Sequence, residues 1–277
     1  MKLSVYQNAL ITQLSELYEE REAGNISKYL LEEKFGKQHL RDDNELTETE
    51  ISELEILKNR LIKAEPVQYV LEEAWFYNLP FKVTPAVLIP RPETEELVLL
   101  AIEIIQNKTS KILDIGTGSG CIAISIKKQC PQCEMHAIDI SKDAIAIAKQ
   151  NAEKMETTIS FHTCSIENFD EENNSNFDII ISNPPYILPA EKKSMHNNVL
   201  QYEPHIALFT PEDDALYFYR IIAKKAKQLL QSSGILLFEI HENQSAAIKD
   251  LLITFGFTDV EILMDFQNKP RIAKAKK

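Results

Sequence analysis

Glycine is scarce in this sequence, and long hydrophobic runs are missing. Only 7 of the 277 residues are glycine, about a third of the usual ~7%. The longest unbroken apolar run spans six residues, Leu97 to Ile102, whereas a membrane-spanning helix needs about 20. The N-terminal segment becomes acidic without a long apolar stretch, which disfavours a secretory signal. We therefore expect a cytoplasmic protein with no membrane span.

Cysteine and positive charge are also in short supply. Four cysteines are too few for a disulfide scaffold of this length. Cys130 and Cys133 have CxxC spacing without a second pair, so we interpret them as ordinary thiols at a helix end and expect no metal site. The net charge is −12, and residues 1–80 hold 16 acidic and 9 basic side chains. This balance disfavours direct nucleic-acid binding and favours a basic protein partner.

The pattern of apolar residues divides the chain into three parts. Residues 1–65 have helical spacing, with a capping-box sequence at Thr47–Glu50, and predict a small helical domain. Residues 66–92 are rich in aromatic, β-branched and proline residues, which is typical of a β-hairpin or an extended linker. Residues 93–277 alternate short apolar strands with helices. This alternation predicts an α/β fold whose ligands bind at the carboxyl ends of mostly parallel strands.

The individual elements can be placed approximately. Strands are expected at 111–115, 134–140, 159–163, 177–182, 234–240, 259–264 and 271–273. Gly24 and Gly36 interrupt the N-terminal pattern and are expected to separate helices. Asp170–Asn176 is a run of polar residues that predicts a solvated loop.

Three of the seven glycines lie within five residues, directly after the first predicted strand. Gly116, Gly118 and Gly120 form a GxGxG pattern, and Asp114 stands two residues before it. The pattern lacks the third glycine position of the dinucleotide fingerprint GxGxxG and the lysine of a phosphate-binding P-loop. Small residues let the backbone approach a bulky ligand, and Asp114 offers an acceptor to a cation. S-adenosylmethionine, with its sulfonium and ammonium groups, fits this pattern.

A second acid, Asp139, ends the next predicted strand, 19 residues after Gly120. At the end of such a strand a carboxylate can accept hydrogen bonds from both hydroxyls of a ribose. Taken alone, Asp139 is equally well explained as an acid that favours the N-terminus of the following helix. Together with the glycine loop, it favours a nucleoside cofactor.

The strand predicted at 177–182 ends in Asn183-Pro184-Pro185-Tyr186. Two consecutive prolines restrict the backbone and predict a rigid rim at the strand end, beside the glycine loop. The Asn183 oxygen and the Pro184 carbonyl can each accept from one N–H of a planar –NH₂ group. Tyr186 can stack on a flat substrate. This arrangement suits methyl transfer to an amide, or to an amino group conjugated with a ring.

These motifs together resemble those of the peptide-chain release-factor glutamine N5-methyltransferases, the HemK/PrmC family. The resemblance extends over nearly the whole chain and rests on Pro66–Tyr69 (PVQY), Leu88–Glu95 (LIPRPETE), Asp114–Gly120 (DIGTGSG), Asp139, Asn183–Tyr186 (NPPY), Glu203-Pro204, Ala207-Leu208 and Lys269–Arg271. It implies a class I S-adenosylmethionine-dependent methyltransferase domain with a Rossmann-like, mostly parallel seven-stranded sheet. A β-hairpin would join this domain to the helical domain, which would recognise the substrate. The implied substrate is the glutamine of a Gly-Gly-Gln loop in class 1 release factors.

The resemblance also implies roles for individual residues. S-adenosylmethionine would be bound by Asp114, Gly116, Thr117, Gly118, Ser119, Gly120 and Asp139. The substrate glutamine would be held by Asn183, Pro184, Pro185 and Tyr186. Of these, Asn183, Pro184 and Tyr186 would act in catalysis, and Asn183 would also lie close to the cofactor.

The sequence departs from the family pattern at two places. Members often carry an acid near the adenine, just after the third strand. Alignment of the strands places Ser165 there and Ile166 against the adenine face, with Glu167 as an alternative contact. Glu72 stands where the family usually has glycine, which affects the linker rather than the site.

Several other functions remain open at this point. They are N5-methylation of a glutamine in a ribosomal protein, methylation of an exocyclic amino group in a nucleic acid, a non-catalytic module that binds S-adenosylmethionine, and an oxidoreductase on a doubly wound sheet. The net charge disfavours the nucleic-acid substrate. The NPPY motif beside the glycine loop disfavours a non-catalytic module, and the missing third glycine of GxGxxG disfavours an oxidoreductase.

Overall fold

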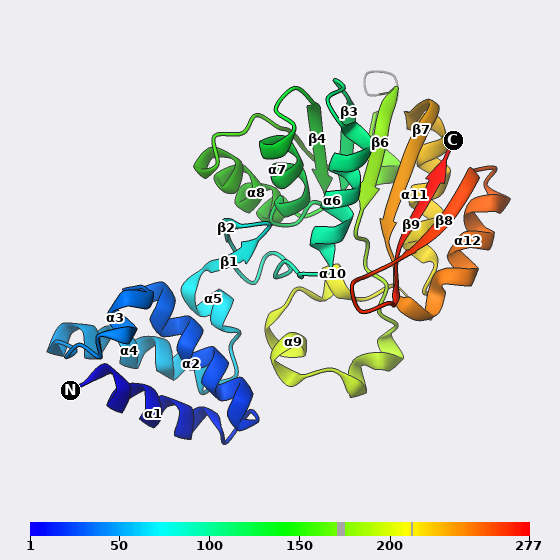
Figure 1. Cartoon of the computed structure of the whole chain (residues 1–277). Coiled ribbons are helices and arrows are strands. Elements are labelled where there is room, and N and C mark those ends of the chain that lie inside the picture. The colour runs from blue at the N-terminus through cyan, green and yellow to red at the C-terminus, as the bar shows by residue number, and fades with distance from the viewer. Residues whose placement is uncertain (171–174, 212) are drawn as a thin grey trace. The chain divides into compact units, whose positions relative to one another are not determined.

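The computed structural model describes residues 1–170, 175–211 and 213–277 (Figure 1). The polar loop predicted at Asp170–Asn176 falls mostly outside these residues. The described chain divides into two compact units. The helical unit consists of Met1–Glu73 and His196–Tyr202, and the α/β unit consists of Ala74–Met195 and Glu203–Lys277.

The helical unit is built around an apolar cluster of leucines. Its helices are α1 (Leu3–Leu14), α2 (Glu20–Phe35), α3 (Lys37–Arg41), α4 (Glu48–Leu61), α5 (Val67–Leu71) and α9 (Asn197–Tyr202). Leu10, Leu30 and Leu54 come from three of these helices and are fully buried in one cluster. The helical spacing of apolar residues in the sequence is therefore the spacing of one buried face on α1, α2 and α4.

The two glycines expected to separate helices behave differently. Gly36 ends α2 with a φ of 81°, a conformation that glycine adopts without the steric cost of a side chain. Gly24 lies inside α2, so the prediction that it separates helices was wrong. The helix continues through it because Ala23, Leu30 and Leu31 bury one continuous face, and this packing outweighs the low helix propensity of glycine.

The capping box predicted at the start of α4 is confirmed. The Thr47 hydroxyl oxygen accepts from the Glu50 N–H at 3.2 Å, and the Glu50 carboxylate accepts from the Thr47 N–H at 2.7 Å. Two backbone donors at the helix terminus, which have no partner within the helix, are satisfied in this way.

The linker predicted at 66–92 contains more than one kind of structure. It begins with α5 and continues with strands β1 (Glu73–Phe76) and β2 (Leu79–Lys82), which pair with each other. Glu72 ends α5 with a φ of 55°. A left-handed residue at this place is more costly for glutamate than for glycine.

The α/β unit contains a seven-stranded sheet in the order β5-β4-β3-β6-β7-β9-β8. The strands are β3 (Lys111–Ile115), β4 (Glu134–Asp139), β5 (Ser160–Thr163), β6 (Phe177–Ser182), β7 (Leu230–Glu239), β8 (Thr258–Met264) and β9 (Pro270–Lys276). Strands β3 to β7 run parallel, and β9 is antiparallel to both of its neighbours. The predicted fold class and its seven strands are confirmed. Strand β7 starts four residues earlier than predicted.

Helices cover both faces of this sheet (Figure 1). The helices that cover it are α6 (Thr94–Ile105), α7 (Cys121–Gln129), α8 (Lys142–Lys154), α11 (Tyr217–Leu229) and α12 (Ser245–Thr254). The unit also contains α10 (His205–Leu208) and the short turns η1 (Ile166–Asn168), η2 (Pro189–Ser194) and η3 (Glu242–Gln244). Successive residues of β3 point to opposite faces. Ile112 packs in the cluster with α6, α7 and α8, and Leu113 packs in the cluster with α11 and α12.

The cysteines are free thiols, and Cys130 directly follows α7, as predicted for thiols at a helix end. Among the described residues, no group of three His, Cys, Asp or Glu side chains is placed to hold a metal ion. None of the helices in the described ranges is both long and apolar enough to cross a membrane.

Replacing Thr47 with alanine removes the side-chain half of the capping box. We expect the local stability of α4 to fall by about 1 kcal/mol, so its amide hydrogens should exchange about fivefold faster. Hydrogen–deuterium exchange measured by mass spectrometry tests this expectation. Thr49→Ala is the control, because Thr49 is exposed inside the same helix and makes no cap. Equal exchange in the two variants would contradict a stabilising role for the cap.

Candidate active site

The loop between β3 and α7 carries the GxGxG pattern. Gly116, Gly118 and Gly120 have φ values of 74°, 55° and 82°, in a region that side chains disfavour. A Cβ on Gly116 or Gly118 would meet nothing within 4 Å, whereas one on Gly120 would lie 2.9 Å from Ile124 and 3.2 Å from Ala148. Gly120 therefore permits close packing of α7 on α8. The other two glycines leave open space beside the loop.

Asp139, at the end of β4, holds this loop in place. One carboxylate oxygen accepts from the Gly118 N–H and the other from the Ser141 N–H, each at 2.9 Å. Burial raises the pKa of Asp139, and these backbone N–H groups oppose the shift. The Asp139 carbonyl also accepts from the Cys164 N–H at 3.0 Å. The segment after β5 is thereby brought to the same edge of the sheet.

Asp114 on β3 is completely buried beside the glycine loop. Its Oδ2 accepts from the Thr117 hydroxyl at 2.6 Å. Its Oδ1 is buried and has no hydrogen-bond partner among the described residues. Burial raises the pKa of Asp114 to about 7; the Thr117 hydroxyl and the backbone N–H of Ala123 oppose the shift, and the charge of Asp139 adds to it. A buried carboxylate oxygen without a partner is costly, and a cationic ligand would satisfy it.

The NPPY segment lies next to the glycine loop because β6 pairs in parallel with β3. Ser182 is opposite Ile115 in this pairing, and the Ser182 hydroxyl donates to the Ile115 carbonyl at 2.8 Å. Asn183 follows directly and is half-buried, and Pro184 is buried. The structure therefore brings the two predicted motifs together at the carboxyl edge of the sheet.

A chain of polar side chains connects Asn183 to the buried Glu239. Asn183 Nδ2 donates to the Thr94 hydroxyl oxygen at 3.2 Å, and Thr94 Oγ1 lies 2.6 Å from Glu239 Oε2. The Tyr186 hydroxyl lies 3.5 Å from Glu239 Oε1. The Tyr219 hydroxyl donates to the backbone carbonyl of Glu239 at 3.0 Å. Two residues of the NPPY segment are therefore linked to one carboxylate, Tyr186 directly and Asn183 through Thr94.

This carboxylate lies in an unusual electrostatic environment. Burial raises the pKa of Glu239 to about 7, a shift that the Thr94 hydroxyl and the charge of Arg271 oppose. Arg271 on β9 is paired with Asp265 at 3.1 Å. Burial, followed by the charge of Glu239, raises the pKa of Tyr186. Tyr186 is therefore a neutral phenol at physiological pH.

No motif in the sequence marks Thr94 or Glu239 as a site residue. Thr94 lies within the segment LIPRPETE, whose Pro92 and Glu93 are typical of the entry of a helix. No local signal marks Glu239, because only the pairing of β6 with β7, in which Ser182 is opposite Phe238, brings it near the NPPY segment. The segment LIPRPETE also contains Arg91, whose guanidinium is 2.7 Å from the buried carboxylate of Glu203.

The predicted adenine contacts differ in exposure. Ser165 is half-buried at the start of η1, Ile166 is buried in an apolar cluster with Ile138, and Glu167 is exposed. All three follow β5 near the end of β4. Their contact with an adenine ring stays a prediction.

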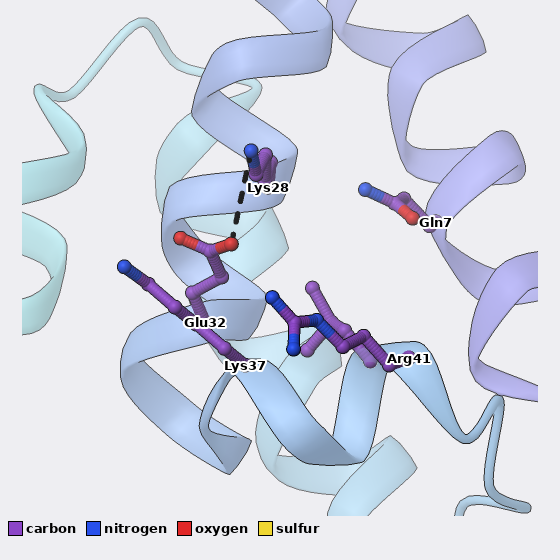
Figure 2. A pocket seen from close by; sticks show the side chains of 6 residues that line it. Gln7, Lys28, Glu32, Lys37 and Arg41 are labelled. Atoms are coloured by element: carbon purple, nitrogen blue, oxygen red, sulfur yellow. Dashed lines mark ion pairs between the residues drawn. The ribbon is translucent and has the colours of Figure 1, made fainter.

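The helical unit has a surface pocket of about 350 Å³ (Figure 2). It is lined by Gln7, Lys28, Glu32, Lys37, Leu40 and Arg41. Lys28 and Glu32, one turn apart on α2, form an ion pair at 3.8 Å. The pocket thus gathers three cationic side chains around one carboxylate, in a part of the chain where acidic side chains predominate.

Comparisons with known proteins agree with this fold. The methyltransferase-domain family matches residues 106–263. The chain is 39% identical to the release factor glutamine methyltransferase of Flavobacterium psychrophilum, with 99% of each chain covered. It is 43% identical to the protein of that name from Bacteroides thetaiotaomicron, with 80% of each covered. The solved structure of a methyltransferase from Pyrococcus furiosus has the same fold, with a TM-score of 0.54 and 17% identity over 82% of this chain and 98% of that chain.

The sheet topology, the glycine loop and the NPPY rim define a class I methyltransferase. Relatives more than 30% identical over nearly the whole chain make the assignment narrower. This chain belongs to the family of release factor glutamine methyltransferases.

Proposed function

We propose that this protein transfers a methyl group from S-adenosylmethionine to the side-chain amide N5 of the glutamine in the Gly-Gly-Gln loop of class 1 release factors. The reaction would take place in the cytoplasm and support translation termination. The observation that carries the proposal is the position of Asn183 and Pro184 beside the glycine loop, which places two acceptors for an –NH₂ group next to space for a cofactor.

The residues of the glycine loop fit S-adenosylmethionine. The unpartnered Oδ1 of Asp114 suits a cationic group, and the open space at Gly116 and Gly118 suits a bulky ligand. Each carboxylate oxygen of Asp139 accepts one N–H and keeps a second lone pair for a ribose hydroxyl. The other residues proposed to hold the cofactor are Thr117, Ser119, Gly120, Ser165, Ile166 and Asn183. When bound, S-adenosylmethionine would supply an electrophilic methyl group and leave as S-adenosylhomocysteine, and no metal is required. The methylated amide, which is strongly acidic, would lose one proton to water or to an acceptor linked to Asn183.

Asn183 and Pro184 supply orientation and charge stabilisation. The nitrogen of a carboxamide is a poor nucleophile because its lone pair is delocalised. Among the described residues, Asn183 Oδ1 has no hydrogen-bond partner, and the Pro184 carbonyl accepts no hydrogen bond. These two oxygens would accept hydrogen bonds from both N–H groups of the substrate amide, and Pro185 and Tyr186 would complete the rim. They would hold its nitrogen toward the methyl donor and stabilise the positive charge that develops there.

We also propose that the helical domain, residues 1–65, recognises the release factor. Its excess of acidic side chains suits a basic protein surface. The pocket of Figure 2 offers cations to a carboxylate of the same partner. No direct contact with nucleic acid and none with a membrane is part of this proposal.

The proposed substrate is tested by methyl transfer from radiolabelled S-adenosylmethionine to purified release factor. We expect label on the release factor and none on a variant whose Gly-Gly-Gln loop carries Glu in place of Gln. Label on a ribosomal protein or a nucleic acid instead would retain the chemistry and overturn the substrate. Such an outcome is chemically reasonable, because an amide and an exocyclic amine present the same –NH₂ group to Asn183.

Replacing Asn183 with alanine removes one of the two proposed acceptors. We expect kcat to fall about 10²-fold, the scale on which loss of one preorganised polar contact acts. Steady-state rates with saturating release factor measure this effect, and the affinity of the variant for S-adenosylmethionine reports on the folding of the site. An unchanged kcat would show that Asn183 does not orient the substrate.

Binding of S-adenosylmethionine should depend on the charge of Asp114. With a pKa near 7, Asp114 carries its charge in most molecules at pH 8 and in few at pH 6. The affinity of the wild type relative to Asp114→Asn should therefore fall about tenfold when the pH is lowered from 8 to 6. Calorimetric measurement of S-adenosylmethionine binding to both proteins gives the ratio of the two affinities. Any change in the protonation of the ligand itself affects both proteins equally and cancels from this ratio. A ratio that does not change with pH would contradict the proposed contact.

A further inference from the structure

The amide of Asn183 must face the substrate with its oxygen. The oxygen and the –NH₂ group of an asparagine are nearly identical in shape, so rotation about the last side-chain bond exchanges an acceptor for two donors. An –NH₂ group turned toward the substrate amide would set donor against donor. The proposed reaction therefore needs something that distinguishes the two ends of this side chain.

Thr94 makes this distinction through its single hydroxyl hydrogen. An ionised carboxylate only accepts hydrogen bonds, so at 2.6 Å from Glu239 Oε2 the Thr94 hydroxyl donates its hydrogen to Glu239. Its oxygen is then left only with lone pairs to offer. At 3.2 Å the partner must be the donor end of Asn183, its Nδ2. The negative charge of Glu239 thus sets the direction of both hydrogen bonds.

We infer that Thr94 and Glu239 are positioning residues, which hold the Asn183 amide with its oxygen toward the substrate –NH₂ group. This inference rests on the proposed function and extends it to two residues that do not touch the substrate. Both are well placed for such a role. Thr94 is 2% exposed and is the first residue of α6, and Glu239 is 2% exposed and is held through its carbonyl by Tyr219.

Protonation of Glu239 would reverse the direction of the hydrogen bonds from Asn183 to Thr94 and from Thr94 to Glu239. A neutral carboxyl can donate to Thr94, whose hydrogen is then free to turn toward Asn183 and to select the oxygen of the amide instead. The charged or titratable groups that act on Glu239 are Glu93 beside Thr94, Cys121 on α7, Tyr186 after β6, Tyr219 on α11 and Arg271 on β9. Arg271 favours the ionised form, and Glu93 opposes it. We therefore expect kcat to decrease as the pH is lowered below about 7.

The inference is tested with Thr94→Val and Thr94→Ser. Valine keeps the shape of threonine and loses both hydrogen bonds, whereas serine keeps them. We expect Thr94→Val to lower kcat between 10-fold and 100-fold, with KM for release factor and affinity for S-adenosylmethionine within about twofold of the wild type. Thr94→Ser should retain kcat within about threefold. Ser125→Ala is the control and should leave kcat unchanged, because it removes a buried hydroxyl of α7 that has no hydrogen-bond partner within the described part of the chain.

Two further readouts separate positioning from packing. If Thr94 acts only through Asn183, the double variant Thr94→Val/Asn183→Ala should be no slower than Asn183→Ala alone. The decrease in kcat at low pH should be present in the wild type and Thr94→Ser and absent in Thr94→Val. Saturating cofactor excludes a contribution from Asp114, which acts on binding.

A third measurement does not depend on turnover. In nuclear magnetic resonance spectra, the side-chain ¹H–¹⁵N signals of Asn183 can be assigned by their loss in Asn183→Ala. The chemical shifts of these signals should change in Thr94→Val and stay the same in Thr94→Ser.

The possible failures are distinct. If the wild type does not methylate release factor, the proposed function fails, and the nuclear magnetic resonance signals still report on the orientation of Asn183. If the wild type is active and Thr94→Val has the same kcat, the inference is wrong. It is also wrong if the effects of Thr94→Val and Asn183→Ala are additive, or if Thr94→Ser is as slow as Thr94→Val, because packing would then explain the loss.

Discussion

Parallel pairing of β6 with β3 is the interaction on which the whole site depends. Each strand ends in a motif that has no function alone: a glycine loop that leaves open space, and a proline rim that offers two acceptors. The register sets Ser182 opposite Ile115, and the hydroxyl of Ser182 closes the junction. A one-residue slip would turn every side chain of β6 to the other face of the sheet. Both motifs are therefore useful only in this one alignment.

The site contains three carboxylates that are wholly or partly buried, and the loss of their hydration on burial disfavours folding. The pKa values of Asp114 and Glu239 are raised to about 7, and that of Asp139 is also raised, in each case mainly by burial. A protein selected for stability alone would replace such groups with apolar ones. Asp139 holds the glycine loop, Glu239 lies beside the Thr94 hydroxyl, and Asp114 is proposed to hold a cationic ligand.

The proposed acceptors specify the chemical group that would react, an –NH₂ group, but they do not specify the substrate molecule that carries it. The acceptor pair proposed at Asn183 and Pro184 would select a planar –NH₂ group, which occurs in glutamine and in nucleobases alike. The family to which the chain belongs favours glutamine in a release factor. Discrimination among proteins would then come from surfaces beyond the rim, such as the surface of the helical unit that is proposed to recognise the partner.

Local sequence determined most of the strands and helices of this protein, the capping box at Thr47 and the two motifs, because each depends on contacts between near neighbours in the chain. It misplaced Gly24, since burial of one face of α2 outweighs local propensity. It gave no sign that His196–Tyr202 groups with the helical unit. Only the tertiary structure brought Thr94, Asn183 and Glu239 together. Asn183 lies 89 residues after Thr94 in the chain, and Glu239 lies 145 residues after it. Strand pairing sets the distances between these side chains in space, and no local sequence pattern records that pairing.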